Sequence, residues 1–259
     1  MGNPTQDSRH LGWLIGLLQT VGQQAAAYGS FWDTISLGVS GPDMSGKIQA
    51  TQFSDCIVLS ALASSEQSTG LLTTFLDQLC LVACLSGFLL RGGITRGPIY
   101  HREGMVYGPA MITAYKIERD IAVYPRIVLD EAVEAEFQHG SLLKEGSEPY
   151  GFRRSWRKDF DGRFFLDYMQ PFGATEIYPA SGRPAWRPNI NYFSNYKYVI
   201  CKGMYDASGD SRVMEKYLWA RDYFALISGE YPEIAMPIIG LERDGRLWGY
   251  AKDEWPSPG

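Results

Sequence analysis

The chain has 259 residues, of which 45% are hydrophobic and 20% are charged, so it is long enough to bury a full core in one large or two small domains. Its formal net charge of −5 and its pI near 5.3 argue against a general binder of nucleic acids or anionic membranes, because nothing draws the whole molecule towards polyanions. A local basic pocket for a triphosphate remains compatible with this balance.

Cysteine usage and the first residues indicate a cytoplasmic protein. The 4 cysteines lie in apolar or aromatic segments without CxxC spacing, so we expect free, buried thiols in a reducing compartment: Cys56, Cys80, Cys84 and Cys201. The start, MGNPTQDSRH, lacks the basic region and the apolar run of a signal peptide. Residues 71–90 come nearest to a membrane span, but Asp77, Gln78 and the glycine pair that follows favour a buried core helix.

The first predicted element is a helix over 11–28, where apolar residues recur at helical spacing. Two short β segments, IQATQF and CIVLSAL, flank the polar pair Ser54-Asp55, which predicts a hairpin with Asp55 at its tip. A buried helix over about 67–87 and a strand, FLLRGGIT, come next.

A second hairpin, GPIYHREGMVY, is expected to turn His101, Arg102 and Glu103 towards water. The helix after it opens at Gly108-Pro109, because proline suits the first helical position, and the strand IAVYPRIVLD follows. From about residue 140 aromatic and polar residues mix with glycine and proline, until 212–228 returns to helical spacing. We therefore expect an α/β (α+β) protein with a core over 1–140 and a C-terminal extension over 141–259 packed on it.

Common phosphate and nucleophile motifs are absent: the sequence has no GxxxxGK[ST] loop, no GxGxxG after a strand, no GxSxG elbow and no HExxH. It offers instead an ordered set of segments: FSDCIVLSA, LLRGGITRGPIYHREGMVYGPAMITAYKIE and YPRIVLD. This set resembles the core of class III nucleotidyl cyclases, and more closely the bacterial pyrimidine cyclases of the Pycsar antiphage systems. The resemblance covers residues 45–130 and extends loosely over the rest.

The resemblance implies a ferredoxin-like βααββαβ core and a reaction that converts UTP, or failing that CTP, to the 3′,5′-cyclic monophosphate and pyrophosphate. Two divalent ions, Mn²⁺ or Mg²⁺, activate the attacking 3′ hydroxyl, and a basic side chain stabilises the pentavalent phosphorus. The resemblance also implies a homodimer with two half-sites and a cyclic nucleotide product that acts on a separate effector. It implies no nucleic-acid or membrane partner.

Each site residue that the resemblance implies also has a structural interpretation. Asp55 is the implied metal ligand, although aspartate often satisfies the backbone of a tight turn. Lys116 and Arg126 are the implied catalytic cations, although a solvated helix face also accounts for Lys116 and a structural role for Arg126. Arg91 either pairs with an acid such as Glu118 or meets a substrate base or phosphate. Substrate contacts are implied for four positions: Phe53, Arg91, Gly93 and Glu118.

The sequence departs from the family pattern in two places. The opening strand FxDxxGF with the first metal aspartate is not found, and Asp33 in FWDTISLG lies too near Asp55 for the helical crossover. We expect an N-terminally truncated chain; the alternatives are a catalytically inactive, nucleotide-binding cyclase homology domain, or an interaction domain that uses the fold without a nucleotide. Ile112 replaces the asparagine of the purine cyclases, which favours a pyrimidine base.

Overall fold

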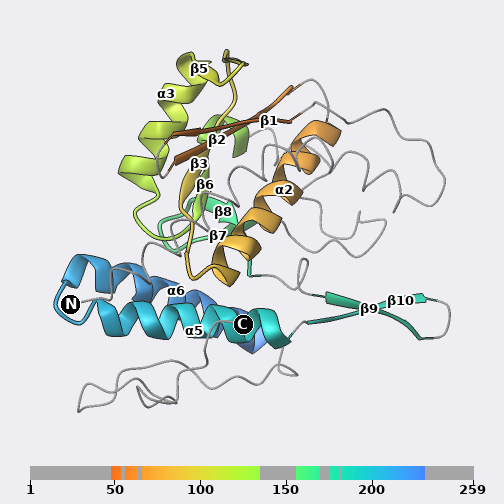
Figure 1. The fold of residues 1–259 in the computed structure, drawn as a ribbon, viewed down its shortest axis with the longest axis vertical. Coiled ribbons are helices and arrows are strands. Elements are labelled where there is room, and N and C mark those ends of the chain that lie inside the picture. The colour runs from red at the N-terminus through yellow and green to blue at the C-terminus, as the bar shows by residue number, and fades with distance from the viewer. Residues whose placement is uncertain are drawn as a thin grey trace. The chain divides into compact units, whose positions relative to one another are not determined.

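The chain is a mixed α/β protein with several small sheets and several helices (Figure 1). It divides into two units, one built from Thr95–Thr113 and the described residues up to Leu76, the other from Asp77–Ile94 and the described residues from Ala114 onward. The computed structural model describes the following residues: 48–53, 56–63, 66–134, 156–169, 175–180, 183–188 and 190–230. The helix predicted over 11–28 lies outside these residues.

The first unit contains two β-hairpins. β1 (Ile48–Phe53) pairs antiparallel with β2 (Cys56–Ala61), which confirms the hairpin predicted from the alternating segments IQATQF and CIVLSAL. β4 (Tyr100–Arg102) pairs antiparallel with β5 (Met105–Tyr107) across a turn in which Glu103 and Gly104 both have positive φ, and this confirms the second hairpin. Gly104 suits that turn because it adopts positive φ without steric cost.

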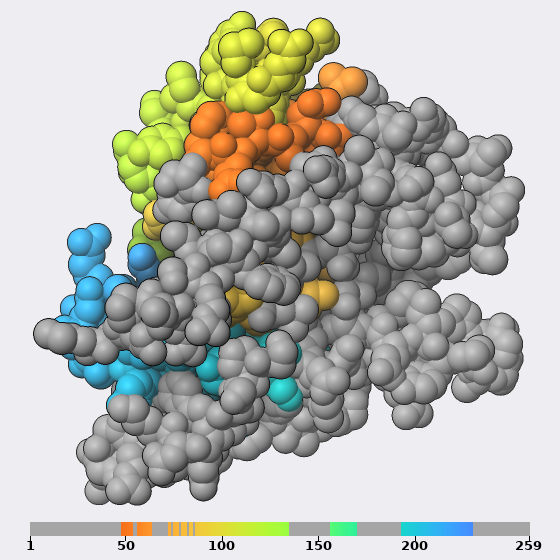
Figure 2. Space-filling model, viewed as in Figure 1, coloured from red at the N-terminus to blue at the C-terminus, as the bar shows by residue number. Residues whose placement is uncertain are grey.

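A buried imidazole joins the two hairpins. His101 Nδ1 lies 2.8 Å from Ser60 Oγ, and Nε2 lies 2.8 Å from Thr51 Oγ1. Figure 2 shows the atoms of the two hairpins, orange and yellow, against each other. The expectation that His101 faces water is therefore wrong: alternation along β4 turns it inward while Tyr100 and Arg102 face out. Burial lowers the pKa of His101, which favours the neutral ring.

The second unit is built on a four-stranded sheet with the strand order β3-β6-β8-β7. β3 (Gly92–Ile94) and β6 (Ile127–Leu129) are parallel, and β8 (Phe164–Leu166) pairs antiparallel with both β6 and β7 (Trp156–Lys158). Strands on both sides of residue 140, where we predicted the end of the core, therefore share one sheet.

Long helices supply much of the buried apolar surface. α2 (Glu66–Leu85) confirms the helix predicted over 67–87, and its buried side chains include Phe75, Leu79, Cys80, Ala83 and Cys84. α5 (Ile190–Asp206) and α6 (Ser211–Glu230) lie side by side (Figure 1), with the rings of Phe193 and Phe224 6.3 Å apart. None of the helices described is long and apolar enough to cross a membrane.

β9 (Thr175–Ala180) and β10 (Arg183–Pro188) form an antiparallel hairpin. None of the four cysteines forms a disulfide, as predicted, but Cys56 at the start of β2 is exposed, so its predicted burial is wrong. Burial of Cys201 raises the pKa of its thiol to about 11, which makes that thiol unreactive at neutral pH.

A helical crossover joins the parallel strands β3 and β6. α3 (Pro109–Lys116) begins at the predicted proline and continues into a π-helical turn, η1 (Ile117–Ile121), closed by a 2.8 Å hydrogen bond from Ala122 N to the Ile117 carbonyl. Gly93 allows β3 to approach this segment closely. A Cβ at Gly93 would lie 2.6 Å from Ile117 Cβ and 2.7 Å from the Ala114 carbonyl oxygen.

This close approach predicts that Gly93→Ala lowers the free energy of unfolding by about 1–3 kcal/mol, because the added methyl group overpacks against backbone. Gly92→Ala is the matched control, since its Cβ would lie at an ordinary 3.7 Å from the Ile127 side chain. We expect Gly92→Ala to change stability by less than about 1 kcal/mol. Urea unfolding of both variants measures the difference, and equal effects would contradict the packing described for Gly93.

Candidate functional site

The site residues implied by the sequence fall in different parts of the chain. Asp55 lies outside the described residues, so its predicted role as metal ligand stays a prediction. Phe53 ends β1 in the first unit and is 43% exposed. The others belong to the second unit: Arg91, Gly93, Lys116, Glu118 and Arg126.

Arg91 forms an ion pair with Glu118. Its Nε lies 2.5 Å from Glu118 Oε1, and the two side chains are 39% and 26% exposed. The sequence left two interpretations open for Arg91, pairing with an acid or contact with a substrate. The structure shows the pairing with an acid. The pair fixes one edge of a partly exposed guanidinium, whose other donors can still contact a ligand.

Lys116 is exposed at the last residue of α3, directly before the π-helical turn η1. Its backbone is regular, with φ −64° and ψ −41°. The pKa of Asp120, one turn later, is lowered mainly by a hydrogen bond from Arg119. The positive charges of Arg119 and Lys116 lower the same pKa further. Lys116 thus places a positive charge on the surface at the end of the crossover helix.

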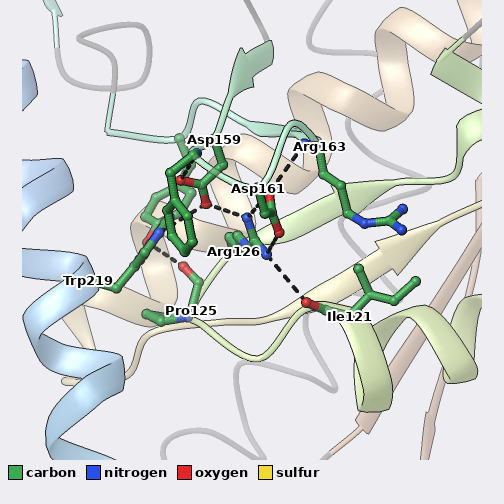
Figure 3. A network of polar contacts seen from close by, with 9 residues as sticks. Ile121, Pro125, Arg126, Asp159, Asp161, Arg163 and Trp219 are labelled. Carbon is green, nitrogen blue, oxygen red and sulfur yellow. Dashed lines mark hydrogen bonds and ion pairs between the residues drawn. The ribbon is translucent and has the colours of Figure 1, made fainter.

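Arg126 is buried, and two carboxylates from the turn between β7 and β8 hold its guanidinium (Figure 3). Asp161 receives hydrogen bonds from Nη2 at 2.5 Å and from Nη1 at 3.1 Å, and Asp159 accepts a further bond from Nη1. Nη2 also donates to the Ile121 carbonyl at 3.3 Å. Both η nitrogens are engaged, whereas Nε finds no acceptor within the described part of the chain.

Further donors satisfy the two carboxylates. Trp219 Nε1 of α6 donates to Asp159 Oδ2 at 3.0 Å, and the Arg163 amide donates to Asp161 Oδ1 at 3.1 Å. The Tyr124 ring lies 5.4 Å from the Arg126 guanidinium and stacks on the Trp219 ring at 5.9 Å. This set, Arg126 with Asp159, Asp161, Tyr124 and Trp219, is called the arginine cluster below.

Arg126 and Asp161 of the arginine cluster are both ionised. Burial raises the pKa of Asp161, but the hydrogen bond from Arg126 and its charge outweigh burial, so the pKa lies below its usual range. Burial lowers the pKa of Arg126, and the two aspartates more than offset that effect. Neither aspartate was predicted from the sequence. Their signal is the run Asp-Phe-Asp-Gly, whose residue types favour a tight turn and place two carboxylates on it.

A second buried polar group surrounds Asp167. The Tyr223 hydroxyl donates to one carboxylate oxygen, and Arg157 Nε donates to the other at 2.9 Å. The Tyr223 oxygen also accepts a 3.0 Å bond from the Met169 amide. Burial raises the pKa of Asp77 well above its usual range, and the negative charge of Asp167 adds to this, which favours the protonated form of Asp77.

No group of three or more His, Cys, Asp and Glu side chains in the described residues fits a metal ion. The predicted metal ligand, Asp55, lies outside the described residues, so the Mn²⁺ or Mg²⁺ site stays a prediction. Comparisons of the chain with protein-family models, with curated proteins and with solved structures found no match.

Removing the buried cation leaves two carboxylates without a counter-charge, so we expect Arg126→Met to lower the free energy of unfolding by about 3–5 kcal/mol. Arg119→Met is the control, because Arg119 also pairs with an aspartate, Asp120, but both side chains are about half exposed. We expect no measurable change for it. Denaturant unfolding of both variants measures the difference. If Arg126→Met changes the free energy of unfolding as little as Arg119→Met, the buried ion cluster is contradicted.

Acid should weaken the arginine cluster. The pKa of Asp161 is lower in the folded chain than in the unfolded chain, so its contribution to stability is present above the unfolded pKa, about 4, and is lost as the pH falls through the folded value. Asp161→Asn should therefore be less stable than the wild type near neutral pH and lose less stability between about pH 5 and pH 3. If the free energy of unfolding falls equally with pH in the two proteins, the prediction is contradicted.

Proposed function

We propose that the chain is a pyrimidine nucleotide cyclase that makes 3′,5′-cyclic UMP from UTP, or cyclic CMP from CTP, as the signal synthase of an antiphage defence system. The observation that carries the proposal is the order of the elements around Lys116. The hairpin β1–β2, helix α2, strand β3, hairpin β4–β5, helix α3 and strand β6 follow in the order that the cyclase resemblance implies, and α3 ends in an exposed cation.

The strand pairing is compatible with the proposed ferredoxin-like core. In that fold the strands of a βαβ unit are split, with a further strand between them. β2, α2 and β3 follow one another as such a unit, and β2 and β3 lie in separate sheets of the described residues rather than pairing directly. The FxDxxGF strand would take the intervening position in the proposed fold.

In the proposed reaction, the ribose 3′ oxygen forms a bond to the α-phosphorus, the bond from the α-phosphorus to the bridging oxygen breaks, and pyrophosphate leaves. The 3′ hydroxyl proton passes to solvent. Negative charge grows on the α-phosphoryl oxygens, and we assign Lys116 to stabilise it, because its ammonium group is exposed. Arg126 is not assigned this role, since its η nitrogens are bound by carboxylates.

Two further roles belong to the proposal. Glu118 holds Nε of Arg91, so the η nitrogens of Arg91 present a planar fork that suits a pyrimidine carbonyl or a phosphate. The two proposed ions, Mn²⁺ or Mg²⁺ with Asp55 as a ligand, would neutralise phosphate charge.

The activity test is incubation of the full-length gene product with each of the four ribonucleoside triphosphates and Mn²⁺, with products identified by mass spectrometry. We expect a cyclic pyrimidine nucleotide, and we expect Lys116→Met to lower kcat by about 10²-fold at an unchanged melting temperature, because it removes a cation from the transition state. Arg119→Met, on the same exposed segment, is the control with normal activity. No cyclic pyrimidine from any substrate overturns the proposal; nucleotide binding without turnover would favour the inactive homology domain.

We also propose a homodimer, supported by the outer face of the β4–β5 hairpin. The Tyr100 and Tyr107 rings stack there at 4.8 Å, and Tyr107 and Met105 are 61% and 52% exposed. Aromatic residues and methionine are enriched at protein interfaces. Sedimentation velocity should show a dimer at tens of micromolar that Tyr107→Glu dissociates, whereas Glu215→Lys on α6 does not. A monomeric wild type speaks against the dimer.

A further inference from the structure

Lys116 is continuous with a segment that two arginines hold. The π-helical turn η1 begins at the next residue, and Glu118 in its first half is bound by Arg91 at 2.5 Å. At its other end, the carbonyl of Ile121 accepts a hydrogen bond from Arg126 Nη2 at 3.3 Å. Gly93 fixes the side of the segment that faces β3, because Ile117 and the Ala114 carbonyl pack against it.

A π-turn needs such support, because π-helices are rare and occur mostly as single turns within α-helices, often at functional sites. If η1 relaxed to an α-helix, the helix before it would move by one residue relative to the chain after it. One residue corresponds to a rotation of about 100° around the helix axis. Since β6 is fixed in the sheet after the turn, that rotation would fall on α3 and on the direction of Lys116. The contact between Arg126 and Ile121 opposes this relaxation.

The arginine cluster sets where the Arg126 fork points. Asp161 binds both η nitrogens, Asp159 binds one of them, and Trp219 of α6 holds Asp159 through its indole N–H (Figure 3). A line of hydrogen bonds therefore runs from α6 through Asp159 and Arg126 to the last carbonyl of the turn that follows Lys116.

We infer that Asp161 and Trp219 are positioning residues that act through Arg126 and the π-turn on Lys116. The inference rests on the proposed function of Lys116. It assigns to Trp219 of α6, which follows Lys116 by more than 100 residues, an effect on the chemical step. If the arginine cluster had only a structural role, substitutions at Asp161 and Trp219 would reduce the amount of folded protein. The turnover per folded molecule would stay normal.

The test is a double-mutant cycle on kcat, measured with the pyrimidine substrate that the wild type turns over and normalised to folded protein. Asp161→Asn keeps the shape of the side chain and removes its charge, and Trp219→Phe keeps an aromatic ring and removes the N–H donor. We expect each to lower kcat by about 5- to 50-fold with KM for the substrate nearly unchanged, a range set by the usual size of coupling between connected groups. Asp206→Asn, an exposed aspartate paired with Lys202 on α5, is the control with normal kcat.

In the Lys116→Met background, neither substitution should lower kcat further, because the group they position is gone. Losses that multiply with that of Lys116→Met, or a normal kcat in folded Asp161→Asn and Trp219→Phe, overturn the positioning role while the cyclase proposal stands. A wild type without cyclic product overturns the proposed function, and with it the inference. Amide hydrogen exchange gives a second readout: residues 117–122 should exchange faster in Asp161→Asn, and unchanged exchange there contradicts the inference.

Discussion

The burial of the Arg126 guanidinium constrains the whole second unit. A guanidinium that is only 1% exposed must be paired, because an uncompensated buried charge costs several kcal/mol. The partners are Asp159 and Asp161, which lie 33 and 35 residues away in sequence, so the chain must return to one point in space. The return brings the turn between β7 and β8 beside the segment that leads into β6.

This constraint matters because the sheet itself offers little backbone pairing. Its strands have three residues each, and β6 meets β8 through the single partner pair Val128 and Phe165. Short strands have few ladder hydrogen bonds, so side-chain contacts must specify the register. The arginine cluster does so at one end of β6, and the Tyr168 hydroxyl adds a 2.7 Å bond to the Pro125 carbonyl. Trp219 extends the same network to α6.

Local signals in the sequence predicted the elements that depend on neighbouring residues. The hairpin β1–β2 follows from period-two alternation around a polar pair, the start of α3 from Pro109, and α2 from its apolar run. In each case the residues that carry the signal lie inside the element, so no distant contact is needed. The strand predicted over FLLRGGIT is found only in part, because β3 covers Gly92–Ile94 and Arg91 lies just before it.

The helix α5 was not predicted, and the other features that the sequence did not predict depend on long-range contacts. His101 is buried because hydroxyls on β1 and β2 receive its ring, and nothing in YHREG indicates that partner. Asp159 and Asp161 have a turn signal, but their destination at Arg126 is set by the pairing of β8 with β6. The π-turn has no sequence signature, since its extra residue is stabilised by contacts at both ends. The mixed α/β class was thus within reach of the sequence, and the connections around the candidate site were not.

The central claim, that Arg126 is locked between two aspartates, is tested most directly by side-chain nitrogen-15 NMR of the arginines. Bonds from both η nitrogens to fixed carboxylates should hinder rotation about the Nε–Cζ bond and slow exchange of the η hydrogens with water. The wild type should therefore show separate, protected η N–H signals for Arg126 near neutral pH, and Asp161→Asn should lose them. Averaged signals for Arg126, like those of the exposed Arg119, would contradict the account.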